Sequence, residues 1–269
     1  MLAADRLNIK WVGSSCLKQP QFSTPKYFQM KHRVLLMLVC FIAFSACAQN
    51  EKTFNDANAQ SRSVGSFHAI RIEDGIDLYL TQGNEEAVAV SASKDEYRDK
   101  ITTKVENGVL FVYYGEERGF NITWRDRKLR AYISVRDIDE IKASSGSDVI
   151  LKGTLTAKKL MLDLSGGSDF VGDVKSTELE IEMSGGSDVN ISGSANNLKV
   201  NGSGGSDFNG YKLAAEYVII QVSGGSDAQL NVTKELFAEA SGGSDIDYRG
   251  SPEIKRKSSS GGSSVTKRG

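Results

Sequence analysis

The chain has 269 residues, of which 39% are hydrophobic and 25% charged, with 27 glycines and only 3 prolines. This composition is typical of a globular protein and excludes a disordered chain or collagen. The first 46 residues carry six of the 33 basic and one of the 34 acidic side chains, which leaves 27 against 33, a net charge of −6, for the remainder. No nucleic-acid partner is expected, because phosphate contact needs a basic surface.

The first predicted element is a secretory leader. A basic start at residues 31–33 precedes an apolar run over residues 34–44, and small residues then lead into Cys47. This three-part design is typical of a signal peptide, which we place at residues 30–46. The apolar run is too short to span a bilayer.

The four residues Phe44-Ser45-Ala46-Cys47 resemble the bacterial lipobox, with Phe in place of the usual Leu. The resemblance implies cleavage before Cys47 and acylation of its thiol, so we expect a protein held at a membrane by a lipid anchor. The alternative is an ordinary signal peptide that is cut after a small residue. By resemblance to lipoprotein sorting signals, Ala48 favours the outer membrane, with periplasmic and surface-exposed orientations both open.

The remaining N-terminal residues are expected to lie outside the folded domain. Residues 1–29 show no periodic pattern, and we predict that they are a mis-annotated upstream segment and that translation begins at Met30. Residues 47–65 are mostly polar and are predicted to be a flexible tether. The two cysteines other than Cys47 fall in removed segments, so no disulfide, thiol nucleophile or cysteine metal site is expected.

Irregular β-strands are predicted from Phe67 to about Val135, where apolar and polar residues alternate. A turn signal stands at Gln82-Gly83-Asn84, and Asn107-Gly108 is typical of a β-hairpin. Residues 95–100 fit a single helical turn. We expect no long amphipathic helix in the mature chain.

Arginine and aromatic residues gather near the end of this region. Together such side chains can hold an acidic glycan, and the residues considered for that contact are Arg118, Trp124, Arg125 and Arg127. The simpler interpretation is a set of loop charges beside a hydrophobic strand. His68 is the only histidine of the predicted mature chain, and we interpret it as a strand residue and not as a catalytic base.

A repeat dominates the second half of the chain. The string Ser-Gly-Gly-Ser-Asp occurs five times, a variant at residues 144–148 precedes it, and a variant at residues 260–264 follows it. The final positions of successive copies lie 18 to 21 residues apart, a period typical of a solenoid. The repeat coils begin at about residue 139, and a polar terminal coil or tail is predicted over residues 255–269.

Alternating apolar residues stand on both sides of each motif, as Leu160, Leu162 and Leu164 do before one copy and Val189 and Ile191 after another. This period of two predicts two short strands per coil, with the glycine-rich motif turning the chain between them. A single coil cannot bury its apolar face, whereas stacked coils bury continuous columns. The predicted fold class is therefore all-β, a parallel β-helix or solenoid with coils of roughly 19 residues, preceded by more irregular strands.

Stacking of the coils also predicts a column of carboxylates about 5 Å apart. The column consists of Asp148, Asp169, Asp188, Asp207, Asp227 and Asp245. The first interpretation is structural: each carboxylate bonds nearby backbone N–H groups as an Asx-turn. The alternative is a row of calcium sites, since Asp, Ser and carbonyl oxygens suit a hard cation. No other cofactor is expected.

The segment from Phe67 to Gly83 resembles the start of the family described as putative auto-transporter adhesin, head GIN domain. Its Gly-Ile-Asn signature stands here as Gly75-Ile76-Asp77, and the Ser-Gly-Gly-Ser-Asp coils are similar to those of family members. The resemblance implies a head GIN-type β-helix domain over residues 66–254 and a role in adhesion. It implies no catalytic residues.

Two classes of function follow. The first is a non-enzymatic envelope lipoprotein that serves as a surface adhesin or structural module, with a glycan or host-surface ligand. The alternative is a carbohydrate-active enzyme on a β-helix, such as a polysaccharide lyase or hydrolase. An enzyme needs convergent acid, base or metal groups in a cleft. Almost every polar feature here recurs coil after coil, which favours the non-enzymatic module.

Overall fold

The computed structural model describes residues 56–115 and 127–269. Within them the chain is nearly all β, with one sheet of 16 strands and one short helix, α2 (Asp95–Arg98), at the predicted helical turn. No helix in this part of the chain is long and apolar enough to cross a membrane.

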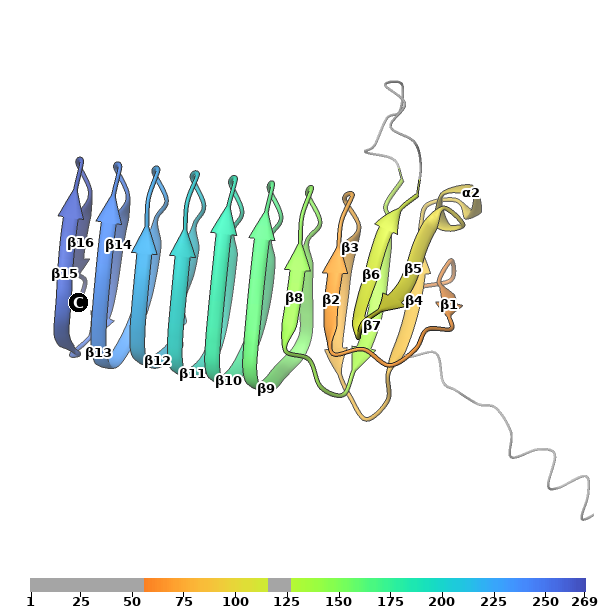
Figure 1. Ribbon diagram of the computed structural model, residues 1–269, viewed down its shortest axis with the longest axis horizontal. Coiled ribbons are helices and arrows are strands. Elements are labelled where there is room, and N and C mark those ends of the chain that lie inside the picture. Colours follow the sequence, from red (N-terminus) through yellow and green to blue (C-terminus); the bar gives the residue numbers. More distant parts are fainter. Residues whose placement is uncertain (1–55, 116–126) are drawn as a thin grey trace, which may run out of the picture. The chain divides into compact units, whose positions relative to one another are not determined.

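The second half forms a stack of parallel coils (Figure 1). Each long strand starts directly after one glycine-rich turn, bends, and runs into the next turn. These strands are β9 (Val149–Ser165), β10 (Phe170–Ser184), β11 (Val189–Gly202), β12 (Phe208–Val222) and β13 (Ala228–Ser241). The predicted parallel β-solenoid is confirmed. The two short strands expected in each coil are joined into one, because pairing between coils continues through the bend with only a local shift of register.

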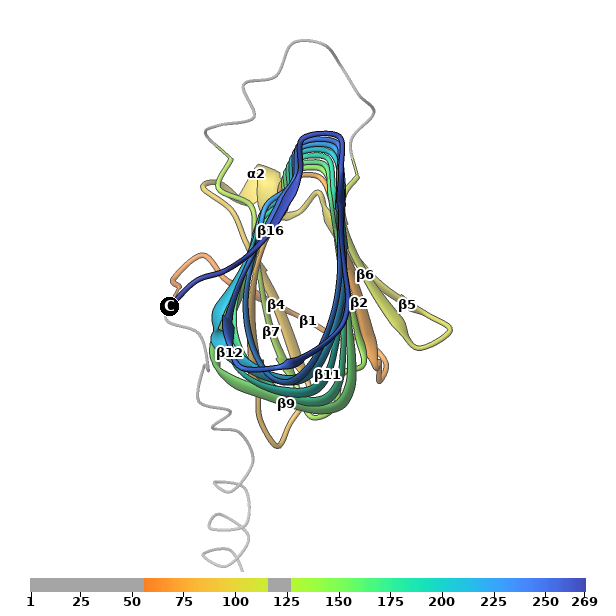
Figure 2. The same ribbon diagram turned by 90° about the vertical axis from the view of Figure 1, so that its left-hand side faces the viewer.

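Each coil is a flattened loop with a tight turn at one end and a wider bend at the other (Figure 2). The half-strands that follow each turn pair with one another, as Phe170 does with Val189, and we call their sheet the post-turn face. The half-strands that lead into each turn pair likewise, as Leu179 does with Leu198, and form the pre-turn face. The core lies between these two faces.

The N-terminal strands extend both faces, but not in chain order. One coil consists of β2 (Ala69–Ile72) and β3 (Asp77–Gln82). On one side β2 pairs with β8 (Glu140–Ala143) and β3 with β9, whereas on the other side β2 pairs with β6 (Val109–Tyr114) and β3 with β7 (Arg130–Val135). The coil that comes first in the sequence therefore lies between two coils that come later.

Antiparallel strands cover this end of the stack. β5 (Ile101–Glu106) pairs with β6 through a hairpin at Asn107 and Gly108, both with positive φ, as the Asn-Gly signal predicts. On the post-turn face β4 (Ala87–Ser91) pairs with β7, and β1 (Gln60–Arg62) pairs with β4. Antiparallel pairing ends the parallel stack here.

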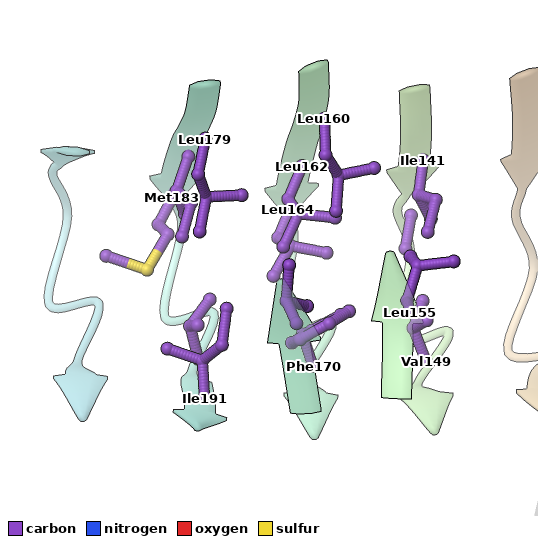
Figure 3. Packing of buried hydrophobic residues seen from close by; sticks show 14 of the residues in the cluster. Ile141, Val149, Leu155, Leu160, Leu162, Leu164, Phe170, Leu179, Met183 and Ile191 are labelled. Carbon is purple, nitrogen blue, oxygen red and sulfur yellow. The ribbon is translucent and has the colours of Figure 1, made fainter. Parts of the chain in front are cut away.

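The core is a set of stacked apolar columns (Figure 3). Leu160, Leu179 and Leu198 are register partners in successive coils, and all three are buried. Phe170 and Phe208 are the largest fully buried side chains. Burying one Leu or Phe side chain stabilises the fold by about 1.5 to 3 kcal/mol. The same column therefore stabilises every coil it crosses.

The outermost coil at the other end is polar. It consists of β15 (Glu253–Ser260), which pairs with β13, and β16 (Ser264–Lys267), which pairs with β14 (Asp245–Gly250). Every residue of β15 is exposed, and its pairing with β13 shifts register after Ile254. Lysine side chains and an irregular register both oppose pairing with another strand at an open edge.

Candidate functional site

The five-residue turns stack along one edge of the solenoid, and we number their positions 1 to 5. The glycines at positions 2 and 3 adopt positive φ in every Ser-Gly-Gly-Ser-Asp copy, for example +68° at Gly185 and +74° at Gly186. A Cβ on Gly185 would lie 3.1 Å from the nitrogen of Gly166 in the neighbouring turn, whereas one on Gly186 would meet nothing within 4 Å. Glycine at position 2 thus permits close stacking as well as the backbone conformation, although Ser145 and Asp74 adopt the same positive φ at this position in two earlier turns.

The serines at position 4 form a buried ladder between coils. The N–H of Ser187 donates to Oγ of Ser206 at 3.2 Å, and the N–H of Ser206 donates to Oγ of Ser226 at 3.1 Å. The Ser206 hydroxyl itself donates to the carbonyl oxygen of Ser203 at 2.9 Å. Each of these serines is fully buried from Ser147 to Ser244. A hydroxyl is required because it accepts from one coil and donates within its own turn.

The aspartates at position 5 form a second ladder, which runs in the opposite direction. Oδ1 of Asp169 accepts the N–H of Asp188 at 3.1 Å, and Oδ1 of Asp188 accepts the N–H of Asp207 at 3.3 Å. All six predicted column members take part, from Asp148 to Asp245. These bonds join neighbouring coils, whereas an Asx-turn would have closed each turn on itself.

The opposite directions of the ladders explain the deviating residues at both ends. In the coil of β2 and β3, position 4 is Ile76, whose N–H donates to Oγ of Ser147 at 3.1 Å. The connection from β6 to β7 in the next coil out is 15 residues long, and most of it lies outside the described residues. In the outermost coil position 5 is Ser264, whose N–H donates to Asp245 at 3.0 Å. Both residues use their backbone N–H in a ladder, and neither carries the Ser hydroxyl or Asp carboxylate that its position has in the repeats.

Asp77 extends the carboxylate column by one member that the sequence pattern did not include. It stands at position 5 of its turn, and its carboxylate accepts a backbone bond from Asp148. Burial, followed by the charge of Asp148, raises the pKa of Asp77, and burial likewise raises the pKa of Asp148.

In the described part of the chain no three His, Cys, Asp or Glu side chains converge as metal ligands. Calcium binding along the column stays an untested alternative.

The ladder predicts different results for two substitutions of Asp188. Asp188→Asn keeps an oxygen that accepts the N–H of Asp207, so the free energy of unfolding should barely change. Asp188→Ala leaves that N–H without its acceptor and should cost about 1 kcal/mol. Chemical denaturation of both variants measures the difference. If calcium were the ligand of the column, both substitutions would remove a site, and millimolar calcium would raise the melting temperature of the wild-type protein by many degrees.

A pH dependence follows from the raised pKa of Asp77. Folding hinders ionisation of this carboxyl, so its contribution to stability is most favourable below the ordinary value of 3.8 and declines as pH rises through the raised pKa of the folded state. Asp77→Asn keeps an acceptor oxygen and removes the charge. The melting temperature of Asp77→Asn minus that of the wild-type protein should therefore be larger at pH 7 than at pH 3. An equal difference at both pH values would contradict this account.

Of the other residues singled out from the sequence, Arg127 and His68 lie in the described part of the chain. Arg118, Trp124 and Arg125 lie outside the described residues, so glycan contact there stays a prediction. Arg127 is only 2% exposed, and its guanidinium lies 4.5 Å from the ring centroid of Tyr114, which does not favour surface contact. His68 directly precedes β2, and its Nδ1 lies 2.9 Å from Oδ1 of Asp139, a bond that raises the pKa of His68.

A surface feature that the sequence analysis missed is a shallow trough of about 680 Å³ on the pre-turn face. Outward side chains of successive coils line it, among them Glu182, Asn201, Gln221 and Glu239. The period of two in each strand places these side chains outward. That they share a hollow depends on how the coils stack, which alternation of polar and apolar residues does not reveal.

A family model matches most of this chain. Residues 66–252 match the family described as putative auto-transporter adhesin, head GIN domain. The chain belongs to this family. The signature at Gly75-Ile76-Asp77 occupies positions 3 to 5 of the first turn, so in this head GIN domain the signature is the end of the serine ladder.

Solved structures share the fold of this head GIN domain. A putative adhesin from Bacteroides fragilis is 21% identical, with a TM-score of 0.71 over 78% of this chain and 96% of that chain. A putative adhesin from Parabacteroides distasonis is also 21% identical, with a TM-score of 0.63 over 78% and 96%. A putative lipid binding protein from the same species is 16% identical, with a TM-score of 0.61 over 80% and 98%. A search of curated protein sequences finds no match.

Proposed function

We propose that this protein is a non-enzymatic adhesin of the cell envelope, held at the outer membrane by a lipid on Cys47. The proposal rests on one observation: residues 66–252 belong to a family that is described as a putative adhesin. Two structural neighbours are described as adhesins as well. The solenoid suits this role because it offers long, regular faces on a rigid scaffold.

The distribution of polar groups supports binding over catalysis. The Ser and Asp ladders repeat the same chemistry at each coil, and the ladder atoms are engaged in bonds between neighbouring turns. An enzyme needs different groups that converge on one substrate atom. The carbohydrate-active alternative is therefore not favoured.

Adhesion itself is tested with cells that carry or lack the gene. Cells with the gene should adhere to host extracellular matrix or to immobilised glycans, and deletion should reduce that adhesion several-fold. Supplying the gene in trans should restore it. Equal adhesion of both strains to the extracellular matrix and to every immobilised glycan tested would overturn the proposed function.

The anchor is tested by Cys47→Ala. A bacterial lipoprotein carries two or three acyl chains, which together hold firmly, whereas a single chain binds only reversibly. The substitution should move the protein from the membrane fraction to the soluble fraction, as an immunoblot of both fractions would measure. Ser45→Ala, which changes a neighbouring residue but keeps the thiol, should leave the protein in the membrane. Retention of the Cys47→Ala protein in the membrane would contradict the anchor.

A further inference from the structure

We propose that the pre-turn face binds an uncharged, linear polysaccharide, with the side chains around Ile219 and Gln221 at the centre of contact. The inference rests on the proposed adhesin function and names the class of its ligand. Four properties of the face carry it: its shape, an exposed apolar centre, the pairing of its charges and its regular repeat.

The shape is an open hollow that crosses several coils. The trough of about 680 Å³ is lined from Asp163 in β9 to Ser258 in β15. Six neighbouring strands at about 4.8 Å give it a length of about 24 Å. A second hollow of about 290 Å³ has Tyr217 and Ile219 in its lining, two to four residues before Gln221 on the same strand. An extended chain fits such a surface better than a single small molecule, which would need a closed pocket.

The centre of this face is apolar although it points outward. Tyr217 is 40% and Ile219 49% exposed, and both lie on the outward side of β12. Ile219 is the register partner of Phe237 in β13, and Tyr217 stands two residues before Ile219 on the same side. Lys234 and Arg256 each lie 5.3 Å from the ring centroids of Tyr217 and Phe237, respectively. Apolar surface beside a few oriented polar groups is the usual composition of a ligand site. The apolar faces of sugar rings can pack on such a patch.

The polar groups around the patch are largely neutral or already paired. Lys199 pairs with Glu180 at 2.6 Å, and Arg256 pairs with Glu239 at 2.6 Å. Gln221 lies between Asn201 and Glu239 in register, and its Nε2 donates to Oε2 of Glu239 at 2.7 Å. Ser223 follows directly after the end of this strand. A charged ligand would have to displace these ion pairs, whereas sugar hydroxyls donate to and accept from amides and hydroxyls without that cost.

The repeat of the face matches a polymer. Each coil places an outward side chain at the same height of the strand, as in the register partners Asn201, Gln221 and Glu239. Because the coils succeed one another at a constant spacing, a chain of regularly spaced sugar units can meet one outward side chain at each coil along the trough. This regularity favours a linear homopolymer over a branched or irregular glycan.

The test uses the full chain carrying Cys47→Ala, so that no anchor interferes. Calorimetric titration with cellohexaose, maltohexaose, xylohexaose and laminarihexaose should show binding of at least one hexasaccharide. Ile219→Arg should weaken that binding at least tenfold, and Gln221→Ala should weaken it several-fold. The matched control is Val171→Arg, since Val171 is also 49% exposed and outward but lies on the post-turn face. This control should bind as the parent protein does.

Three results would overturn the inference. The first is that no uncharged hexasaccharide binds although cells carrying the gene still adhere, which would leave the adhesin function standing with another ligand. The second is equal loss of binding in Ile219→Arg and Val171→Arg. The third is co-sedimentation with phosphatidylcholine vesicles that Ile219→Arg abolishes and Val171→Arg does not, which would assign the patch to lipid.

Discussion

Replacement of Ile181 by Asp is expected to unfold several coils of the solenoid at once. Ile181 is fully buried and stands in register between Leu162 and Val200, so a carboxylate there would enter an apolar column without a partner. Truncation of a buried Ile alone costs about 2 to 5 kcal/mol, and an unpaired buried charge adds to that cost. Because each coil is stabilised chiefly by its neighbours, loss of one exposes the next. Thermal and urea unfolding followed by circular dichroism would measure the effect.

The neighbouring residue provides the control. Glu182 follows Ile181 on β10 and points to the opposite side of the strand. Glu182→Ala should change the free energy of unfolding by less than about 0.5 kcal/mol, as is usual for surface positions. Equal destabilisation by Ile181→Asp and Glu182→Ala would contradict the assignment of the buried side.

Gly193→Ala is expected to have the second largest effect. Gly193 lies at the bend of β11 with φ of +112°, and a Cβ there would overlap the carbonyl oxygen of Val174, its register partner in the preceding coil. Alanine would have to adopt a strained backbone and also displace a neighbouring strand. We expect a loss of at least about 3 kcal/mol, measured by urea denaturation.

Gly153→Ala separates the two contributions. Gly153 has φ of +91°, but a Cβ there would meet nothing within 4 Å. Its substitution should cost only the strain of the backbone, about 1 to 2 kcal/mol. If both variants lost the same stability, the close approach at Gly193 would have no energetic importance.

The coils were predictable because they repeat the same local pattern. Alternation around each motif places Leu160, Leu179 and Leu198 on one inward column, and the structure buries all three. The confirmed hairpin at Asn107 and Gly108 is equally local, since two residues with positive φ specify that turn. A feature encoded in a few consecutive residues can be read directly from them.

Features that depend on which coil lies beside which could not be predicted in this way. Nothing in the sequence around Ile70 indicates that β2 pairs with both β6 and β8, because these pairings join segments far apart in the chain. For the same reason the sequence did not indicate that Asp77 belongs to the carboxylate column, since its turn lies far from the repeats in the sequence and lacks their serines. The partners of the Asp side chains likewise depend on the direction of stacking.

The opposed ladders also bear on how such a protein changes its length. A unit of about 19 residues copied between Asp169 and Asp245 would bring its own serine acceptor for the coil before it and its own carboxylate for the coil after it. Neither boundary would be left with an unmatched turn, and Ile76 and Ser264 would still serve as the terminal residues. Each added unit would extend the molecule by about 4.8 Å. Reach can therefore evolve by duplication of whole units, independently of the chemistry of either end.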